Sequence, residues 1–181
     1  MKIIVSLSNG RNILILLLLF LMANLIAIPA LYPKFQTLDT LVTYSPEKAY
    51  NLISSYGEQG RQYYAMIELT LDLIYPLISA LLFSFVTLYT FHHGFPGFPW
   101  TDQLALVPFG ILLADYLENA CIIIMLVSYP RQLSFVAEIS NIFTVIKLAL
   151  TPFELFFLAG LIGWLIRRIR SGRKTELHAR H

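Results

Sequence analysis

The run LALVPFGILLADYLENACIIIMLV, from Leu104 to Val127, decides the fold class of this chain. It is almost entirely apolar, and it exceeds the ~20 residues that a helix needs to cross a hydrocarbon core of about 30 Å. Its charged and amide side chains are grouped near its middle, at Asp115, Glu118 and Asn119. Burying one ionisable side chain in a bilayer costs about 2.5–3.5 kcal/mol on insertion scales. The run therefore predicts a membrane-spanning helix that carries part of a polar site.

Three further apolar runs have the same character. We expect spanning helices at about 13–31, 63–91, 104–127 and 139–166, within one integral membrane domain that covers 1–181. The composition agrees, because 57% of the residues are hydrophobic and 13% are charged, whereas a soluble domain has about 25% charged residues. The predicted fold class is an all-α, four-helix transmembrane bundle.

The segment 32–62 is the one sizeable stretch between spans. Ser45, Pro46 and Glu47 are typical of a helix start, with an N-cap, a proline at the first helical position and an early acid. Apolar residues then follow at helical spacing, at Ala49, Leu52, Ile53 and Tyr56. We expect a short amphipathic helix near Pro46–Tyr56 that lies on the membrane or caps the bundle.

Lysine and arginine residues gather next to both ends of the chain, and their distribution predicts its orientation in the membrane. The segment 167–181 is a basic tail that begins with Arg167 and Arg168, whereas the loop between the last two spans has only Arg131. We therefore expect both termini in the cytoplasm and 32–62 on the outer face of a bacterial cytoplasmic membrane.

Arg61 and Tyr64 are expected at the outer end of the second span. Tyrosine side chains are common at the interface between membrane and water. Arg61 precedes Glu68 by two helical turns on the same face, so its guanidinium can offset the charge of that carboxylate.

Helical spacing places the polar side chains of three spans on single faces. Asp72, Glu118 and Lys147 also share one depth, roughly 12–14 Å below the outer edge of the bundle. We expect the three faces to meet in one polar cluster and Lys147 to pair with a carboxylate, because an unpaired buried charge is costly. The predicted cluster contains Glu68, Asp72, Tyr75, Asp115, Glu118, Asn119, Thr144, Lys147 and Thr151.

The charges of this cluster do not cancel, because four carboxylates face one ammonium group. Some of the carboxylates must therefore be protonated, solvated or paired with a cationic ligand. We expect no metal, because no histidine lies in a span and the carboxylates lack the spacing of di-iron bundles. The alternative to a ligand site is an ion-pair network that only fixes the register of the helices.

Three short motifs carry a resemblance to known proteins. They are GxxGRxxY at Gly57–Tyr64, DxxYP at Asp72–Pro76 and DxxEN at Asp115–Asn119. Together with Lys147 they resemble small uncharacterised four-span bacterial integral membrane proteins, over about 57–152. The resemblance implies that the polar residues belong together, and it implies no activity.

Three functions are consistent with the sequence. The first is an accessory subunit, or a protein that binds a lipid or another amphiphile. The second is an intramembrane enzyme acting on a lipid, with Asp115 or Glu118 as acid or base and Lys147 as electrostatic stabiliser or nucleophile. The third is a proton-coupled or cation transporter that works as an oligomer. The expected partners are membrane lipid and either a larger membrane complex or further copies of the chain, not nucleic acid, and no cofactor is indicated.

Overall fold

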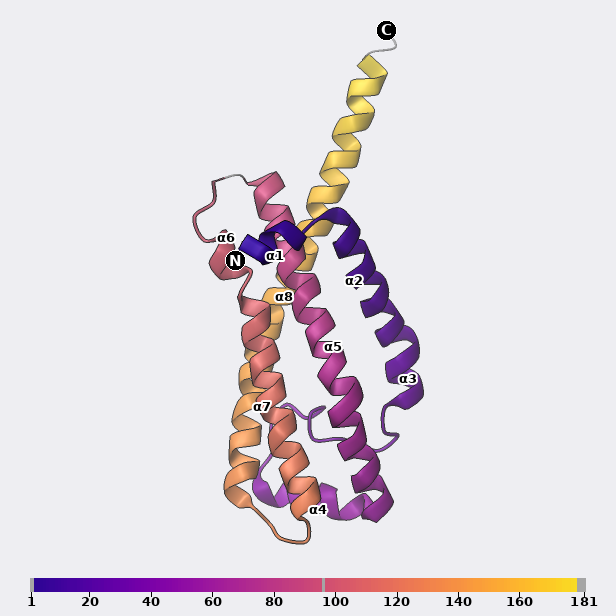
Figure 1. Cartoon of the computed structure of the whole chain (residues 1–181), viewed down its shortest axis with the longest axis vertical. Helices are drawn as coiled ribbons and strands as arrows, with labels where there is room; N and C mark the ends of the chain where they lie inside the picture. The colour runs from indigo at the N-terminus through magenta and orange to yellow at the C-terminus, as the bar shows by residue number, and fades with distance from the viewer. Residues whose placement is uncertain (1, 96, 179–181) are drawn as a thin grey trace.

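The computed structural model describes residues 2–95 and 97–178. The chain is 82% helical, and the described residues contain no strand. Four helical segments are long and apolar enough to cross a membrane, at Gly10–Leu31, Gly57–Gly94, Thr101–Ser128 and Ser134–Phe156. The predicted all-α four-helix transmembrane bundle is confirmed (Figure 1).

The described residues contain eight α-helices and one π-helical turn. In chain order they are α1 (Lys2–Leu7), α2 (Gly10–Met22), the π-helical turn Ala23–Ala27, α3 (Ile28–Leu31), α4 (Pro46–Ser55), α5 (Gly57–Gly94), α6 (Thr101–Leu104), α7 (Val107–Ser128) and α8 (Ser134–His178). The first span consists of α2, the π-helical turn and α3.

The helix α5 is longer than the span expected from hydropathy. It begins at Gly57, whose positive φ of 65° allows the sharp change of direction after α4. The segment 57–62 is therefore helix rather than loop. Gly60 permits a close approach there, because a Cβ atom at this position would lie 3.1 Å from Cβ of Tyr56. At the other end, His92 and His93 belong to the last helical turn rather than to the connecting loop.

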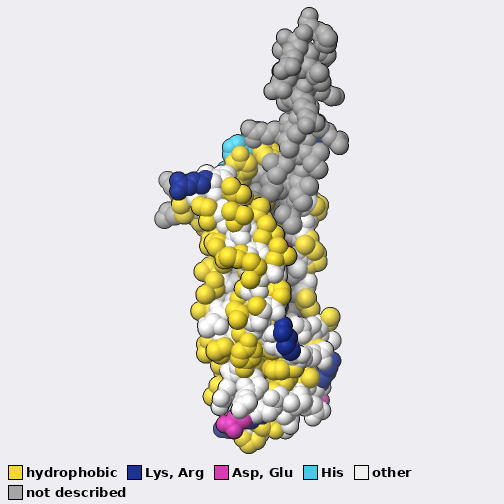
Figure 2. Space-filling view, turned by 90° about the vertical axis from the view of Figure 1, so that its right-hand side faces the viewer, with side chains coloured by type: hydrophobic (Ala, Val, Ile, Leu, Met, Phe, Trp, Pro, Cys, Tyr) yellow, Lys and Arg dark blue, Asp and Glu magenta, His cyan; other side chains and the backbone are white. Residues whose placement is uncertain are grey.

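The helices α5, α7 and α8 pack against one another and form the body of the bundle, whereas α2 packs on α5 (Figure 1). The other faces of the first span are exposed, with Leu18, Leu25 and Ile26 between 58% and 73% accessible. Hydrophobic side chains cover the middle of the face drawn in Figure 2, and the visible charged side chains lie toward its two ends. This distribution is that of a protein surrounded by hydrocarbon.

The helix α4 and the loop before it close one end of the bundle, opposite α1 and the last turns of α8 (Figure 1). Ser45 caps α4, because its Oγ atom accepts a hydrogen bond from the backbone N–H of Lys48 at 3.3 Å. The buried face of α4 packs with loop residues and with side chains of α5, α7 and α8 in one apolar cluster, which includes Leu38, Leu41, Tyr44, Ala49, Tyr50, Ile53, Tyr64, Ile122, Met125 and Ala137. The sequence analysis left open whether this helix lies on the membrane or covers the end of the bundle. The structure shows that it covers the end of the bundle.

The π-helical turn inside the first span provides a side-chain contact with α5. The backbone N–H of Ile28 bonds to the carbonyl of Ala23, one residue further back than in an α-helix. Within this turn Asn24 donates from Nδ2 to the carbonyl of Phe20 at 2.8 Å. Its Oδ1 atom accepts a hydrogen bond from the hydroxyl of Tyr75 at 3.3 Å. The first span thus makes one specific polar contact with α5.

Candidate functional site

Lys147 lies between two carboxylates of α7. Its Nζ atom is 2.9 Å from Oδ1 of Asp115 and 2.6 Å from Oε2 of Glu118. The carboxylate of Glu118 is fully buried, and its second oxygen, Oε1, accepts a hydrogen bond from Oγ1 of Thr144 at 2.6 Å. The expected pairing of Lys147 with a carboxylate is therefore present, and it involves both Asp115 and Glu118. We call these four residues the lysine cluster.

A chain of hydrogen bonds connects the lysine cluster to the loop that closes the bundle. The hydroxyl of Tyr44 donates to Oγ of Ser140 at 2.8 Å, one helical turn from Thr144. Oδ1 of Asn141 accepts from the backbone N–H of Tyr44 at 2.8 Å. Burial raises the pKa of Tyr44 to about 12, so this hydroxyl stays protonated and keeps its role as a donor. The position of the loop is thereby tied to α8.

Pro76 explains a second contact between helices. A proline inside a helix removes the N–H that would bond to the carbonyl four residues earlier, which here belongs to Asp72. Nδ2 of Asn119 donates to that carbonyl at 3.1 Å, and the hydroxyl of Tyr116 donates to the carbonyl of Leu73 at 2.6 Å. Side chains of α7 thus satisfy backbone groups of α5 next to the proline, as membrane helices require.

A second group of carboxylates lies where the loop meets α5. Asp39 of the loop approaches Glu68 and Asp72, and one carboxylate oxygen from each lies within 4.8 Å of the others. Both oxygens of Glu68 are buried and have no hydrogen-bond partner, and only 2% of this residue is exposed. Oδ2 of Asp72 is also buried without a partner. We call Asp39, Glu68 and Asp72 the carboxylate cluster.

Asp39 is held in place by two tyrosine hydroxyls. Tyr64 donates to its Oδ1 atom at 2.7 Å, and Tyr32 donates to its Oδ2 atom. Burial and the nearby Asp39 carboxylate raise the pKa of Tyr32 well above its ordinary value, so this hydroxyl remains a donor. The hydroxyl of Tyr64 also accepts from the backbone N–H of Leu38 at 3.1 Å. Tyr64 is fully buried, so its side chain packs inside the closed end of the bundle.

A cavity of about 450 Å³ lies between α5, α7 and α8, with the loop and α3 at its edge. Asp39 and Asp72 of the carboxylate cluster and Asp115 and Lys147 of the lysine cluster form part of its wall. Further polar side chains of the wall are Tyr32, Thr40, Tyr75, Ser79, Asn119, Thr151 and Glu154. The apolar part of the wall consists of Ile28, Pro76, Pro108, Ile111 and Leu112. The cavity is therefore amphipathic and carries an excess of acidic groups.

Most of the predicted polar residues thus surround one space. Six of them line the cavity directly: Asp72, Tyr75, Asp115, Asn119, Lys147 and Thr151. Glu118 and Thr144 lie behind Lys147, and Glu68 lies in the carboxylate cluster. The hydroxyl of Thr151 donates a hydrogen bond to the backbone carbonyl of Lys147 at 2.8 Å. Sequence reasoning missed Asp39, although it is the first acidic residue of the chain and has leucine on one side and a Thr-Leu pair on the other.

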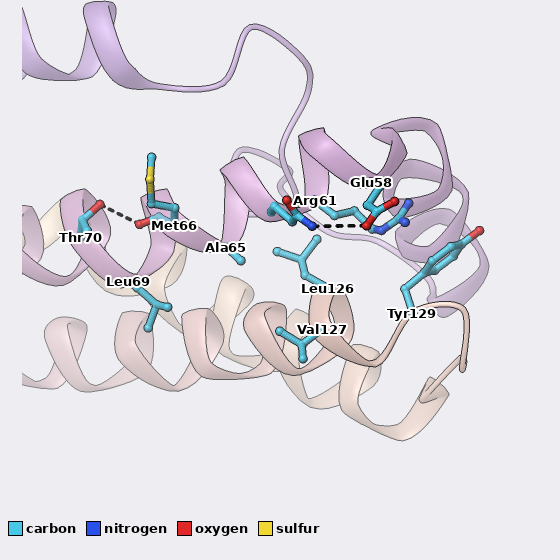
Figure 3. A pocket seen from close by; sticks show the side chains of 10 residues that line it. Glu58, Arg61, Ala65, Met66, Leu69, Thr70, Leu126, Val127 and Tyr129 are labelled. Atoms are coloured by element: carbon cyan, nitrogen blue, oxygen red, sulfur yellow. Dashed lines mark hydrogen bonds between the residues drawn. The ribbon is translucent and has the colours of Figure 1, made fainter.

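The side chain of Arg61 does not pair with Glu68. Its guanidinium carbon lies 4.4 Å from the centre of the ring of Tyr129, above its face, and no ion pair joins it to Glu68 among the described residues. It borders a second hollow of about 680 Å³ between α5 and the end of α7, where Gln62 donates to Oε1 of Glu58 at 3.4 Å (Figure 3). Leu69, Leu126 and Val127 give this hollow an apolar floor. The expected offset of the Glu68 charge was therefore wrong.

The basic residues Arg167 and Arg168, which mark the start of the predicted cytoplasmic tail, are described in part. The side chain of Arg167 is exposed, and its Nε atom donates to the carbonyl of Gly163 at 3.3 Å. The side chains of Arg168 and of the rest of the basic tail lie outside the described part of the structure.

Comparison of the chain with models of protein families, with curated proteins and with solved structures finds no match. The resemblance of its short motifs to small bacterial four-span proteins therefore stays a prediction.

Proposed function

We propose that this protein binds a membrane amphiphile and holds its polar head group in the cavity between α5, α7 and α8. The observation that carries the proposal is the cavity itself, which opens among spanning helices and has both polar and apolar walls. Its volume of about 450 Å³ falls within the range of about 300–1,000 Å³ that is usual for ligand sites. A scaffold for helix packing alone would need no such space.

The charges of the wall suggest which head groups fit. Asp39, Asp72, Asp115 and Glu154 face the cavity, and the single ammonium group of Lys147 is already engaged by two carboxylates. Acceptors therefore outnumber free donors. Groups that donate hydrogen bonds, such as an amine or several hydroxyls, complement this wall, whereas an exposed phosphate is repelled by it.

The apolar wall suggests where the rest of the amphiphile lies. Pro76 and Pro108 lie deeper in the bundle than the acidic groups nearest the loop, because each is further along its helix from the α4 end. Ile28 of α3 adds an apolar side chain on the side of the first span. A head group at Asp72 and Asp115 would therefore continue into methylene or ring carbons along these residues.

An intramembrane enzyme acting on a lipid is a second candidate, and one observation favours it. Asp115 borders the cavity and also contacts Lys147, so its carboxylate is placed to exchange a proton with a bound molecule. Lys147 is a poor candidate for a nucleophile, because two carboxylates stabilise its charged form. Its role in such an enzyme would be electrostatic.

The setting of the proposed activity is a bacterial cytoplasmic membrane with both chain ends in the cytoplasm. Lysine and arginine next to the ends support this orientation. The amphiphile would then bind in the outer half of the bilayer, below α4. The exposed apolar side of the first span can be covered by lipid, by a larger membrane complex or by a second copy of the chain.

The test compares two tryptophan substitutions at neighbouring positions of α7. Leu112 lines the cavity, whereas Leu113 is 60% exposed on the outside of the bundle. The Leu112→Trp variant is expected to lose a specific co-purifying amphiphile, measured by mass spectrometry of lipid extracts after mild detergent purification, and Leu113→Trp is expected to keep it. Equal lipid content in both folded variants and the unchanged protein would refute the proposal. Chemical conversion of the lipid by the purified protein would favour the enzyme. Proton uptake into vesicles that contain the protein would favour a transporter.

A further inference from the structure

We propose that Asp39, Glu68 and Asp72 form a binding site for one divalent cation of the size of calcium. The three side chains converge from two separate elements, the loop before α4 and two successive turns of α5. One carboxylate oxygen of each lies within 4.8 Å of the other two. Carboxylate oxygens are the ligands that Ca²⁺ and Mg²⁺ prefer in proteins.

The state of Glu68 is the independent observation that points to a ligand. Only 2% of this residue is exposed, and neither of its carboxylate oxygens has a hydrogen-bond partner. Buried carboxylates are normally paired with donors, with cations or with a metal. One oxygen of Glu68 lies within 4.8 Å of an oxygen of Asp39 and of an oxygen of Asp72, so the missing partner belongs at the centre of the carboxylate cluster.

No basic side chain among the described residues supplies that partner. Lys147 is engaged by Asp115 and Glu118, and Arg61 lies over the ring of Tyr129. The hydroxyls of Tyr32 and Tyr64 both donate to Asp39 and leave Glu68 without a donor. These two contacts fix Asp39 in position, which is what a coordination site built partly from a loop requires.

The flexible coordination geometry of calcium favours it over magnesium at a site built partly from a loop. Oxygens that bind Ca²⁺ at about 2.3–2.6 Å lie up to about 5 Å apart when they are on opposite sides of the ion. Three oxygens that all lie within 4.8 Å of one another can therefore converge on one such ion with small adjustments of their side chains. Mg²⁺, with bonds of about 2.0–2.1 Å, requires oxygens within about 4.2 Å and a regular octahedron. The adjoining cavity offers room for the water molecules that complete a calcium coordination shell.

A bound cation would join the loop to α5. Asp39 is part of the loop that packs with α4 into the closed end of the bundle, so a cation shared with Glu68 and Asp72 would stabilise that end. This inference goes beyond the proposed binding of an amphiphile, because it needs the carboxylate cluster and not the deeper, apolar part of the cavity.

Calcium binding is tested with the full-length protein in detergent, after treatment with a chelator. Isothermal titration with CaCl₂ is expected to show one ion per chain, and MgCl₂ is expected to bind at least about tenfold more weakly. Loss of an outer-shell partner already weakens metal binding about 10–100-fold, so Glu68→Gln and Asp39→Asn are each expected to weaken calcium binding by more than tenfold. Glu58→Gln changes an exposed carboxylate of the same helix and should leave binding unchanged.

Thermal unfolding supplies a second measurement. Calcium is expected to raise the Tm of the unchanged protein and of Glu58→Gln, and not that of Glu68→Gln, because a ligand stabilises only a folded state that binds it. The Leu112→Trp variant should keep its calcium even where it loses the amphiphile, which separates this proposal from the previous one. Absence of calcium binding by the folded, metal-free protein would overturn the inference and leave a shared proton as the partner of Glu68. Unchanged calcium binding in folded Glu68→Gln would overturn it as well.

Discussion

The Nζ atom of Lys147 lies 2.6 Å from Oε2 of Glu118, whose side chain is fully buried between α7 and α8. The other neighbour of Lys147, Asp115, keeps 13% of its side chain exposed and borders the cavity. The two carboxylates therefore differ in what happens when the ammonium is removed. Asp115 can be solvated from the cavity, whereas Glu118 keeps only the hydroxyl of Thr144 as a donor.

Replacing Lys147 alone is expected to destabilise the fold. The Lys147→Met variant leaves the charge of Glu118 buried and unpaired, which costs about 3–5 kcal/mol. Adding Glu118→Gln removes that charge and should restore most of the loss. The free energy of unfolding in mixed detergent micelles measures both effects, and Lys48→Met, at an exposed position of α4, should stay within about 0.5 kcal/mol of the unchanged protein. A full-sized loss in the double variant would contradict this account.

A triple substitution separates ligand binding from scaffolding. In Lys147→Met combined with Asp115→Asn and Glu118→Gln, the lysine cluster loses all three of its charges, so none is left buried and unpaired. We expect a folded protein that has lost its amphiphile, measured by lipid mass spectrometry of the purified sample. If the amphiphile content and the cellular phenotype stay unchanged, the lysine cluster is an element of helix packing only.

Two adjacent tyrosines provide a matched comparison at the closed end of the bundle. Tyr64→Phe deprives Asp39 of a donor and leaves the buried N–H of Leu38 without an acceptor, so it is expected to cost about 1–3 kcal/mol. Tyr63 is 38% exposed and donates to the carbonyl of Leu31. Water can replace that contact, so Tyr63→Phe should cost less than about 1 kcal/mol. Chemical denaturation of the two variants decides between this ranking and the reverse.

Pro76 and Asn119 are expected to be coupled in energy. Asn119→Leu leaves the carbonyl of Asp72 without a donor and should cost about 1–3 kcal/mol. In a Pro76→Ala background the helix regains its own N–H at that place, so the same change should cost less. A double-mutant cycle on unfolding free energies should give a coupling of about 0.5–3 kcal/mol. Strictly additive effects would mean that the amide does not compensate for the proline.

The orientation in the membrane is testable by cysteine labelling in a Cys121→Ala background. Lys48→Cys, exposed on α4, should react with a membrane-impermeant maleimide added to intact cells. Arg11→Cys, exposed at the start of α2, should react only after permeabilisation. Labelling with the opposite pattern would invert the proposed topology.

The helices and the faces that meet were readable from the sequence because both depend on local periodicity. Four apolar runs indicated the bundle. The helical period of about 3.6 residues placed Asp115 and Glu118 on one face of α7 and Lys147 on the polar face of α8, so the two faces were expected to meet. The start of α4 was readable for the same reason, since Ser45 and Pro46 specify it locally. These signals survive in the structure because hydrocarbon leaves a backbone few alternatives to a helix.

The side-chain positions that depend on the loop could not be predicted from local periodicity. Asp39 reaches the site because Leu38 and Leu41 are buried between α4 and the bundle, and no short-range pattern encodes that packing. Tyr64 looked interfacial from its place in the chain, but the loop covers it. Arg61 lies on the helix face expected to approach Glu68, yet its long side chain extends over Tyr129 instead. Rotamers and loop paths depend on tertiary contacts that periodicity does not contain.

The interruption of α5 at Pro76 is compensated in a different helix, by the amide of Asn119. A consequence concerns the evolution of such chains. The two positions are 43 residues apart in the sequence, but they are expected to change together. Without the proline, the carbonyl of Asp72 no longer needs the amide, and without the amide the proline leaves that carbonyl unpaired. In an alignment of related chains, a proline at the first position should coincide with a hydrogen-bond donor at the second. Their covariation would then identify the contact between α5 and α7 in chains for which no structure exists.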